Sequence, residues 1–347
     1  FEKKYAESLI NKKASNSEIM NDSKFFEENY AESLLKKALN NESAGFKEGQ
    51  WEAIDALVNK LKRVLVVQKT GWGKSIVYFI AARLLKKKNK GLTLVISPLL
   101  ALMRNQVDSA TKLGLSAFTI NSTNSSNKED RDEITKKIED GEIDLLLVSP
   151  ERLSNQDFLN EVLEKYSNKI NMLVVDEAHC ISDWGHDFRP DYKRISSILR
   201  TMPSNVPILG TTATANNRVI DDIKKQFGNI EIQRGPLLRE SISLHVRVEE
   251  SRSKRLAWLA SEIPNLPGSG IVYTSTTRDA ELVNDWLQEN KIESKAYHSF
   301  IESKDMKSVE YRPYLENLLF ENKIKVLVAT TALGMGYDKK DLGFVIH

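Results

Sequence analysis

Short apolar runs alternate with longer amphipathic stretches over most of the chain after Gly45. The apolar runs are four to six residues long, the length of buried strands, and the stretches between them space their apolar residues like helices. This alternation predicts an α/β fold with a parallel sheet covered by helices on both faces. In the first series we expect strands at Val64–Gln68, Leu92–Ser97, Ala117–Ile120, Asp144–Ser149, Met172–Asp176 and Val206–Thr211, and helices at Ser75–Lys88, Leu99–Leu113, Glu129–Asp140, Asp157–Tyr166, Tyr192–Met202 and Asn217–Phe227.

A second α/β series follows a segment that we interpret as an interdomain linker. This segment, Gly228–Glu240, contains Gly235-Pro236, a pair typical of turns and loops. Beyond it we expect strands at Ser243–Glu249, Gly270–Tyr273, Ser294–Tyr297, Lys325–Ala329 and Phe344–Ile346, and helices at Arg252–Ile263, Asp279–Asn290 and Lys304–Glu321. The pattern therefore predicts two tandem domains, residues 45–235 and 236–347, with the reaction site in the cleft between them.

The first 44 residues contain an internal duplication. Phe1-Glu2 and the run Tyr5–Leu9 recur 25 positions later as Phe26-Glu27 and Tyr30–Leu34. Their apolar residues have helical spacing, so we expect two similar amphipathic helices in an N-terminal extension, residues 1–44. Two alternatives stay open: the helices pack on the adjacent domain, or they dock a partner protein.

Composition and charge narrow the class of protein. The chain has 347 residues and a net charge of +2, so any nucleic-acid contact must come from local patches. Its one cysteine, Cys180, excludes a disulfide framework and a cysteine-rich zinc module, which predicts a cytoplasmic protein, near the nucleoid if bacterial. No apolar run approaches the length of a membrane span. Because Phe1 is not an initiator methionine, we expect the natural N-terminus upstream.

The strand ending at Leu173–Val175 runs straight into two carboxylates and a histidine, Asp176, Glu177 and His179. Ligands bind outside the carboxyl ends of strands in open α/β sheets, so these side chains are candidates for chemistry. Asp176 is placed to hold Mg²⁺ directly or through water, and Glu177 to accept a proton from an attacking water. The following segment, Cys180–Tyr192, combines aromatic rings, a guanidinium and an imidazole, which suits stacking on splayed bases and binding phosphate.

A phosphate loop is predicted where the strand Val64–Gln68 runs into Lys69–Ser75 and then a helix. Backbone N–H groups of a glycine-rich loop and a helix N-terminus bind anionic oxygens together. Lys74 is expected to reach the β- and γ-phosphates of a nucleotide, and the Ser75 hydroxyl to ligate Mg²⁺.

Two other strands end in the dipeptide Ser-Pro. Ser97-Pro98 and Ser149-Pro150 each offer hydroxyl and N–H donors to a phosphate at the start of a helix. Either alone is common helix capping. The presence of both dipeptides at one edge of the sheet favours a track that binds a nucleic-acid strand.

The DEAH sequence Asp176–His179 and the loop Trp184–Arg189 resemble the RecQ family of superfamily 2 DNA helicases. The motifs Gly45–Ile54, Val95–Val107, Gly210–Ala215 and Val326–Lys339 occur in the family's order. The resemblance runs from Gly45 to His347. It implies two RecA-like P-loop NTPase domains, ATP and Mg²⁺ as cofactors, single-stranded and tailed or forked duplex DNA as partner, and 3′→5′ ATP-dependent unwinding.

The resemblance also implies roles for individual residues. Those expected to bind the nucleotide are Lys47, Gln50 as the adenine reader, Thr70, Gly71, Gly73, Lys74, Ser75, Gly336 and Asp338, with Lys74, Asp176, Glu177 and His179 in catalysis and Ser75 and Asp176 on Mg²⁺. Those expected to contact DNA, or to couple it to hydrolysis, are Ser97, Pro98, Ser149, Trp184, His186, Phe188, Arg189, Thr212, Thr214, Ser275, His298 and Thr330.

The sequence departs from the family pattern in several places. Lys69 stands where the family usually has proline, and Trp72 where it usually has glycine. No arginine cluster follows Asp338, and no zinc-binding or winged-helix region is present, so we expect residues 1–347 alone to bind ATP and DNA but to hydrolyse ATP slowly. Two rival functions stay open, an ATP-gated DNA clamp that unwinds nothing and an RNA-directed helicase. The pathway, whether repair, recombination or defence, is not specified by the sequence.

Overall fold

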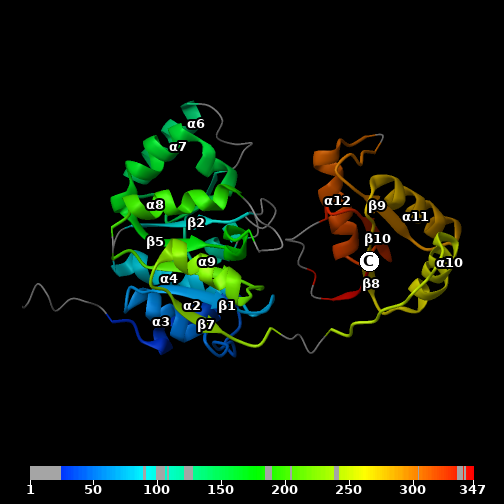
Figure 1. Cartoon of the computed structure of the whole chain (residues 1–347), viewed down its shortest axis with the longest axis horizontal. Coiled ribbons are helices and arrows are strands. Elements are labelled where there is room, and N and C mark those ends of the chain that lie inside the picture. Colours follow the sequence, from blue (N-terminus) through cyan, green and yellow to red (C-terminus); the bar gives the residue numbers. More distant parts are fainter. Residues whose placement is uncertain are drawn as a thin grey trace, which may run out of the picture. The chain divides into compact units, whose positions relative to one another are not determined.

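The chain divides into two compact units, Phe1–Glu240 and Ser241–His347 (Figure 1). The computed structural model describes residues 25–347 apart from 89–90, 99–105, 108, 121–127, 184–189, 204, 238–241, 304, 334–338 and 340. Within this part of the chain, no helix combines the length and the apolarity that crossing a membrane requires.

Seven strands of the described residues form a parallel sheet in the first unit, in the order β3-β4-β2-β5-β6-β1-β7. Their bounds are β1 Arg63–Val67, β2 Leu92–Ile96, β3 Ala117–Ile120, β4 Leu145–Val148, β5 Ile170–Val175, β6 Ile208–Thr212 and β7 Glu231–Arg234. The inner strands are short apolar runs buried on both faces, as expected of strands that helices cover on either side.

Two described helices of the first unit precede β1 in the chain, and the others lie between the strands. Their bounds are α2 Glu28–Leu39, α3 Gln50–Val58, α4 Lys74–Lys88, α6 Lys128–Glu139, α7 Gln156–Phe158, α8 Ile195–Thr201 and α9 Asn217–Phe227. Short 3₁₀ turns are η1 Pro150–Ser154, η3 Ser167–Lys169, η4 Ala178–Ile181 and η5 Pro190–Arg194, and η2 Leu159–Glu164 is a π-helix. The stretch predicted as one α-helix, Asp157–Tyr166, is therefore mostly π-helical.

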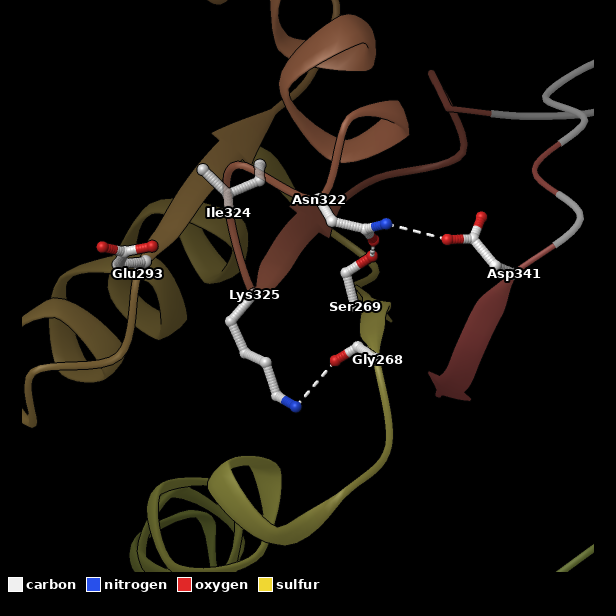
Figure 2. A pocket seen from close by; sticks show the side chains of 7 residues that line it. All are labelled: Gly268, Ser269, Glu293, Asn322, Ile324, Lys325 and Asp341. Atoms are coloured by element: carbon white, nitrogen blue, oxygen red, sulfur yellow. Dashed lines mark hydrogen bonds between the residues drawn. The ribbon is translucent and has the colours of Figure 1, made fainter.

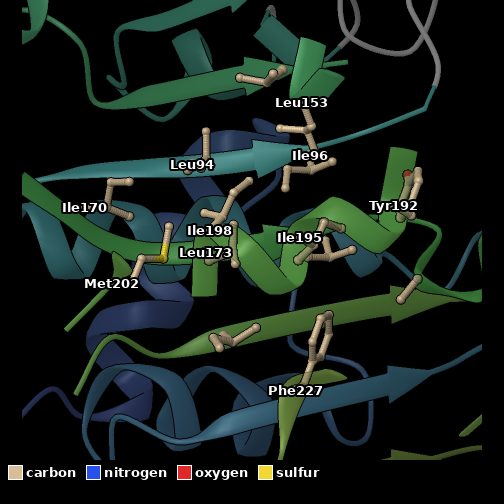
Figure 3. Packing of buried hydrophobic residues seen from close by; sticks show 14 of the residues in the cluster. Leu94, Ile96, Leu153, Ile170, Leu173, Tyr192, Ile195, Ile198, Met202 and Phe227 are labelled. Carbon is tan, nitrogen blue, oxygen red and sulfur yellow. The ribbon is translucent and has the colours of Figure 1, made fainter. Parts of the chain in front are cut away.

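Two apolar cores lie on opposite faces of this sheet. Along β1, Leu65 and Val67 belong to one core, while Val64 and Val66 belong to the other, because successive side chains of a strand point to opposite faces. Figure 3 shows part of the first core, where side chains from β2, β5, α8 and α9 meet. The site edge of the sheet is thus supported from both sides.

The helix α2 packs on the first unit. Its residues Ala31 and Leu35 are buried in the core that also contains α3 and α4, and Lys87 of α4 lies over the Tyr30 ring at 4.5 Å. For this second copy of the duplication, the packing alternative is the one found. The first copy lies outside the described residues, and a role in binding a partner stays a prediction.

In the second unit, four described strands form a parallel sheet in the order β11-β8-β10-β9. Their bounds are β8 Ser269–Tyr273, β9 Ser294–Tyr297, β10 Val326–Ala329 and β11 Leu342–Ile346, with helices α10 Arg252–Glu262, α11 Thr277–Glu289 and α12 Ser308–Phe320 and the 3₁₀ turn η6 Ile263–Asn265. Apolar clusters again cover both faces, one containing Val272 and Val328, the other Ile271 and Leu327.

Two sequence predictions near the boundary of the units are wrong. The segment interpreted as a linker contains β7, which pairs in parallel with β1 as an edge strand. In contrast, Ser243–Glu249 is not a strand, although its apolar residues alternate, and Leu244, Val246 and Val248 are 90%, 94% and 85% exposed. Alternation marks a strand only where a neighbour supplies backbone hydrogen bonds, and no described strand pairs with this segment.

Phe227, at the end of α9, provides a test of the core beneath β6 and β1. Its ring is fully buried, so Phe227→Ala should lower the free energy of unfolding by about 3–5 kcal/mol. Urea denaturation measures this loss. Phe25→Ala is the matched control, because Phe25 is 68% exposed and its removal should change little. Equal effects of the two substitutions would contradict the assigned core.

Candidate nucleotide-binding site

Sheet order brings together motifs that lie far apart in the sequence. The strands β5, β6 and β1 are neighbours, and all three run in the same direction. Their carboxyl ends therefore lie at one edge of the sheet, where α/β proteins bind ligands. The loop before α4 follows β1, Asp176 and Glu177 follow β5, and Thr211 and Thr212 end β6.

The predicted phosphate loop joins β1 to α4. Gly71 and Gly73 have φ values of +83° and +99°, which residues with a side chain rarely adopt. Thr70 is exposed, and Ser75 is the second residue of α4, where its hydroxyl lies beside the helix N-terminus. The loop thus has the backbone shape and the helix that anion binding needs.

Lys74 directs its ammonium group back into the loop. Its Nζ donates to the carbonyl oxygen of Gln68 at 2.9 Å and to that of Lys69 at 3.4 Å. Burial lowers the pKa of Lys74, and the carboxylates Glu177 and Asp176 oppose that shift. A phosphate group that binds here would replace two neutral acceptors with an anionic one, which is a stronger partner for an ammonium.

The predicted adenine reader, Gln50, is tied to this loop. Gln50 is 3% exposed; its Oε1 accepts from the backbone N–H of Lys47 at 2.9 Å, and its Nε2 donates to the carbonyl oxygen of Trp72 at 2.9 Å. The Lys47 ammonium donates to the carbonyl oxygen of Gly71 at 2.7 Å. Both residues therefore brace the phosphate loop, a contact that the sequence did not reveal, and reading adenine stays a prediction.

The contacts of Trp72 explain why a tryptophan stands where the family usually has glycine. Its ring is 6% exposed and belongs to the core beneath α3 and α4, and its Nε1 donates to the carbonyl oxygen of Glu48 at 3.2 Å. A tryptophan here fastens the loop to the segment that carries Gln50. Glycine at this position could not make either contact.

Asp176 is 8% exposed and surrounded by donors. Its Oδ1 accepts from the Thr211 hydroxyl at 2.5 Å and from the backbone N–H of Glu177 at 3.1 Å, and its carbonyl oxygen accepts from the Tyr192 hydroxyl at 2.9 Å. Burial raises the pKa of Asp176, the charge of Glu177 adds to the shift, and the Thr211 bond opposes it. A nearby cation would favour the ionised form.

The residues at this edge fit a magnesium ion that arrives with a nucleotide. The described part of the chain holds no cluster of three side chains able to bind a metal by themselves. Mg²⁺ typically takes one or two carboxylates and completes its shell with phosphate oxygens and water. Asp176 offers the carboxylate and Ser75 a hydroxyl, as that mode requires.

Glu177 and His179 form a chain of contacts that reaches β6. Glu177 has a φ of +50°, an uncommon left-handed conformation for a residue with a side chain, such as functional sites often hold. His179 Nδ1 lies 3.2 Å from Glu177 Oε2 and 2.9 Å from Thr212 Oγ1. The Thr212 hydroxyl donates in turn to the carbonyl oxygen of exposed Thr214 at 3.0 Å. His179 is thus buried between Glu177 and the end of β6, and its predicted role in catalysis stays a prediction.

The predicted DNA track has a less open geometry than expected. Ser97 and Ser149 follow the adjacent strands β2 and β4, so they do lie at one sheet edge with Pro98. Both hydroxyls are buried, and neither has a hydrogen-bond partner among the described residues. Their contact with a phosphate stays a prediction. Trp184, His186, Phe188 and Arg189 lie outside the described residues.

In the second unit, three predicted DNA contacts follow neighbouring strands. Ser275 is exposed after β8, whereas His298 and Thr330, after β9 and β10, are buried. His298 Nε2 lies 2.8 Å from Glu281 Oε1, and the Thr330 hydroxyl accepts from the backbone N–H of Ala332 at 3.3 Å. Ser275 alone of these three is open to a ligand. Gly336 and Asp338 lie outside the described residues.

The second unit has a pocket of about 380 Å³ (Figure 2). It lies at the amino ends of the strands, whereas α/β sheets bind ligands at the carboxyl ends. It is formed at the amino ends of β8, β10 and β11, and its polar groups bond one another. The Asn322 amide donates to Asp341 Oδ2 at 2.8 Å and accepts from Ser269 at 2.6 Å, while Lys325 donates to the carbonyl oxygen of Gly268. Lys339 holds the pKa of Asp341 at about 2. The polar groups of this pocket therefore stabilise the fold of the second unit.

Comparison with known proteins matches the two units to helicase domains. Residues 47–223 match the DEAD/DEAH box helicase family, and residues 254–347 match the helicase conserved C-terminal domain. The chain belongs to the DEAD/DEAH box helicase family. The fold class predicted from the sequence, two RecA-like domains, is confirmed.

The resemblance to RecQ DNA helicases is confirmed by similar curated proteins. The chain is 34% identical to the ATP-dependent DNA helicase RecQ of Bacillus subtilis over 87% of its own length and 49% of the relative. It is 36% identical to the ATP-dependent DNA helicase Q-like 2 of Arabidopsis thaliana, over 87% of this chain and 42% of that protein. The chain thus spans about half the length of these relatives.

Solved helicase structures share the fold. Mss116p bound to single-stranded RNA and AMP-PNP aligns with a TM-score of 0.69 at 16% identity, covering 90% of this chain and 66% of that one. The helicase Lhr of Mycobacterium smegmatis, bound to single-stranded DNA and AMP-PNP, aligns at 0.66 with 18% identity, covering 90% and 43%. At these identities the likeness establishes the fold alone.

Gln50 provides a test that separates adenine reading from loop bracing. If the amide reads adenine, Gln50→Ala should weaken ATP binding by about tenfold or more and GTP binding much less, because a hydrogen-bonding site discriminates strongly. Fluorescence titration with ATP and GTP analogues measures both affinities. Equal losses for the two nucleotides would assign Gln50 to bracing alone.

Proposed function

We propose that this protein is an ATP-driven DNA helicase that translocates on single-stranded DNA in the 3′→5′ direction and unwinds tailed or forked duplexes. The observation that carries the proposal is the contact chain Glu177–His179–Thr212–Thr214 beside the phosphate loop. It ties the candidate hydrolytic carboxylate to the end of a different strand. The RecQ helicases that this chain resembles are named as ATP-dependent DNA helicases, which supports DNA as the partner.

In this proposal, residues of the first unit bind ATP and prepare the attacking water. Lys74 exchanges its loop carbonyls for the β- and γ-phosphates, and loop N–H groups bind the remaining oxygens. Ser75 and Asp176 would hold Mg²⁺, which would supply positive charge beside the phosphate oxygens. Glu177 accepts the proton of the attacking water, and His179 fixes the orientation of its carboxylate.

Coupling to DNA follows from the second half of the contact chain. Thr212 bonds both the carbonyl oxygen and the N–H of Thr214, so a shift of the loop after β6 would disturb the His179 ring. Because His179 also contacts Glu177, such a shift would change how the water is oriented. Contacts that DNA makes beyond β6 can thereby alter ATP turnover. The proposed setting is the cytoplasm, and the proposed protein contact is the N-terminal extension, residues 1–44.

Glu177→Gln tests the proposed base. The amide keeps the shape of the carboxylate but accepts no proton, so ATP affinity should stay within about twofold while turnover falls by roughly 10²–10⁴. DNA-stimulated ATPase kinetics and nucleotide titration on the full-length protein measure the two effects. Glu142→Gln, an exposed change in the same unit, should have neither. Normal turnover in Glu177→Gln would remove Glu177 from the reaction.

Strand displacement separates the helicase from its rivals. The full-length protein that contains residues 1–347 should unwind duplexes with a 3′ single-stranded tail, but not those with a 5′ tail, and only with ATP. ATP-dependent retention of DNA without displacement would favour a clamp, and stimulation by RNA that equals stimulation by DNA would favour an RNA-directed enzyme.

A further inference from the structure

Two buried side chains near Asp176 have polar atoms that no described residue satisfies. Gln106 is 7% exposed and Tyr78 is 1% exposed. Within the part of the chain that the structure describes, the Oε1 of Gln106 and the hydroxyl of Tyr78 have no hydrogen-bond partner. A buried polar atom left unpaired costs free energy, so such atoms at a functional site call for an explanation.

Gln106 contacts the side of the Asp176 carboxylate that the other donors leave open. The Thr211 hydroxyl and the N–H of Glu177 both engage Oδ1. Gln106 Nε2 donates to Oδ2 at 3.4 Å, and within the described residues it is the one donor to that oxygen. Donors on both oxygens fix the plane of a carboxylate, which decides where its free lone pairs point.

The unmatched atoms of Gln106 and Tyr78 are complementary. The hydroxyl of Tyr78 is a donor in need of an acceptor, and Gln106 Oε1 is an acceptor in need of a donor. The two side chains lie in one region, because Tyr78 belongs to the core against which Val107, the residue after Gln106, packs. Burial and the charge of Asp176 raise the pKa of Tyr78, and the Gln106 amide opposes that shift. A small rotation of the amide would join Tyr78, Gln106 and Asp176 in one chain of hydrogen bonds.

Tyr78 and Gln106 come from two segments whose predicted functions differ. Tyr78 lies in the second turn of α4, the helix that begins at Lys74 of the phosphate loop. Gln106 lies eight residues after Pro98, in helical residues of the stretch that follows β2 and that is predicted to contact DNA. Gln106 thus contacts the carboxylate from the part of the chain that is predicted to contact DNA.

We propose that Gln106 is a positioning residue that orients the Asp176 carboxylate for the nucleotide-bound Mg²⁺, with Tyr78 holding the amide in place. This inference rests on the proposed function, in that it assumes Mg²⁺·ATP binding at this edge. It adds a second path from the DNA track to the nucleotide, separate from the path through His179.

The test is the magnesium dependence of nucleotide binding. Fluorescence titration with an N-methylanthraniloyl-labelled ATP gives affinity in EDTA and at graded Mg²⁺ concentrations, without any turnover. Gln106→Leu should bind the nucleotide normally in EDTA, but need about tenfold more Mg²⁺ for half-maximal tightening, since losing a partner of a metal ligand typically costs 10–100-fold in metal affinity. Tyr78→Phe should show a smaller rise in the same direction.

Gln156→Leu is the matched control, because Gln156 is exposed in the same unit, and its magnesium requirement should equal that of the wild type. If Gln106→Leu does not fold, Gln106→Asn replaces it, since its amide is one methylene too short to reach Asp176. An unchanged magnesium requirement in the Gln106 variant, or an equal loss of affinity with and without Mg²⁺, would overturn the proposal. A wild-type protein that shows no magnesium-dependent binding would instead refute the proposed function.

Discussion

The candidate site depends on the parallel register of three neighbouring strands. Val67 of β1 lies opposite Thr212 of β6, and Val175 of β5 lies opposite Gly210. This register puts Thr211 within hydrogen-bond distance of Asp176. It also lets the N–H of Gln68, the first residue after β1, bond the carbonyl oxygen of Thr212 at 3.0 Å. A slip of one residue would turn every side chain of a strand to the opposite face, so the buried cores on both faces fix the chemistry at the edge.

Charge at this edge is balanced within the protein before a ligand binds. The pKa of Lys74 is lowered and that of Asp176 is raised, in both cases chiefly by burial, so each group is held where its charged form is less stable than in water. Loop carbonyls satisfy the ammonium, and Thr211 and Gln106 satisfy the carboxylate. A nucleotide with its cation would replace these weaker partners, and the fixed surroundings keep the reorganisation small.

The sequence predicted most strands because buried parallel strands are short apolar runs bounded by polar residues. It failed at the edge strand β7, where three of the four residues are polar and pairing depends on β1. It also failed at Ser243–Glu249, whose apolar residues alternate although no described strand pairs with it. The glycines and Lys74 of the loop were predictable because phosphate binding requires them. The bracing by Gln50 and the contact of Gln106 with Asp176 were not, since these contacts join segments 22 and 70 residues apart.

The central claim is that Lys74 and the loop before it bind the phosphates of ATP. Isothermal titration of the wild-type protein and of Lys74→Ala with a non-hydrolysable ATP analogue and Mg²⁺ tests it directly. Removing one partner of a buried charged contact typically costs 2–5 kcal/mol, so the variant should lose about thirtyfold or more in affinity. Lys69→Ala, in the same loop, should lose far less. Equal affinity of wild type and Lys74→Ala would contradict the account.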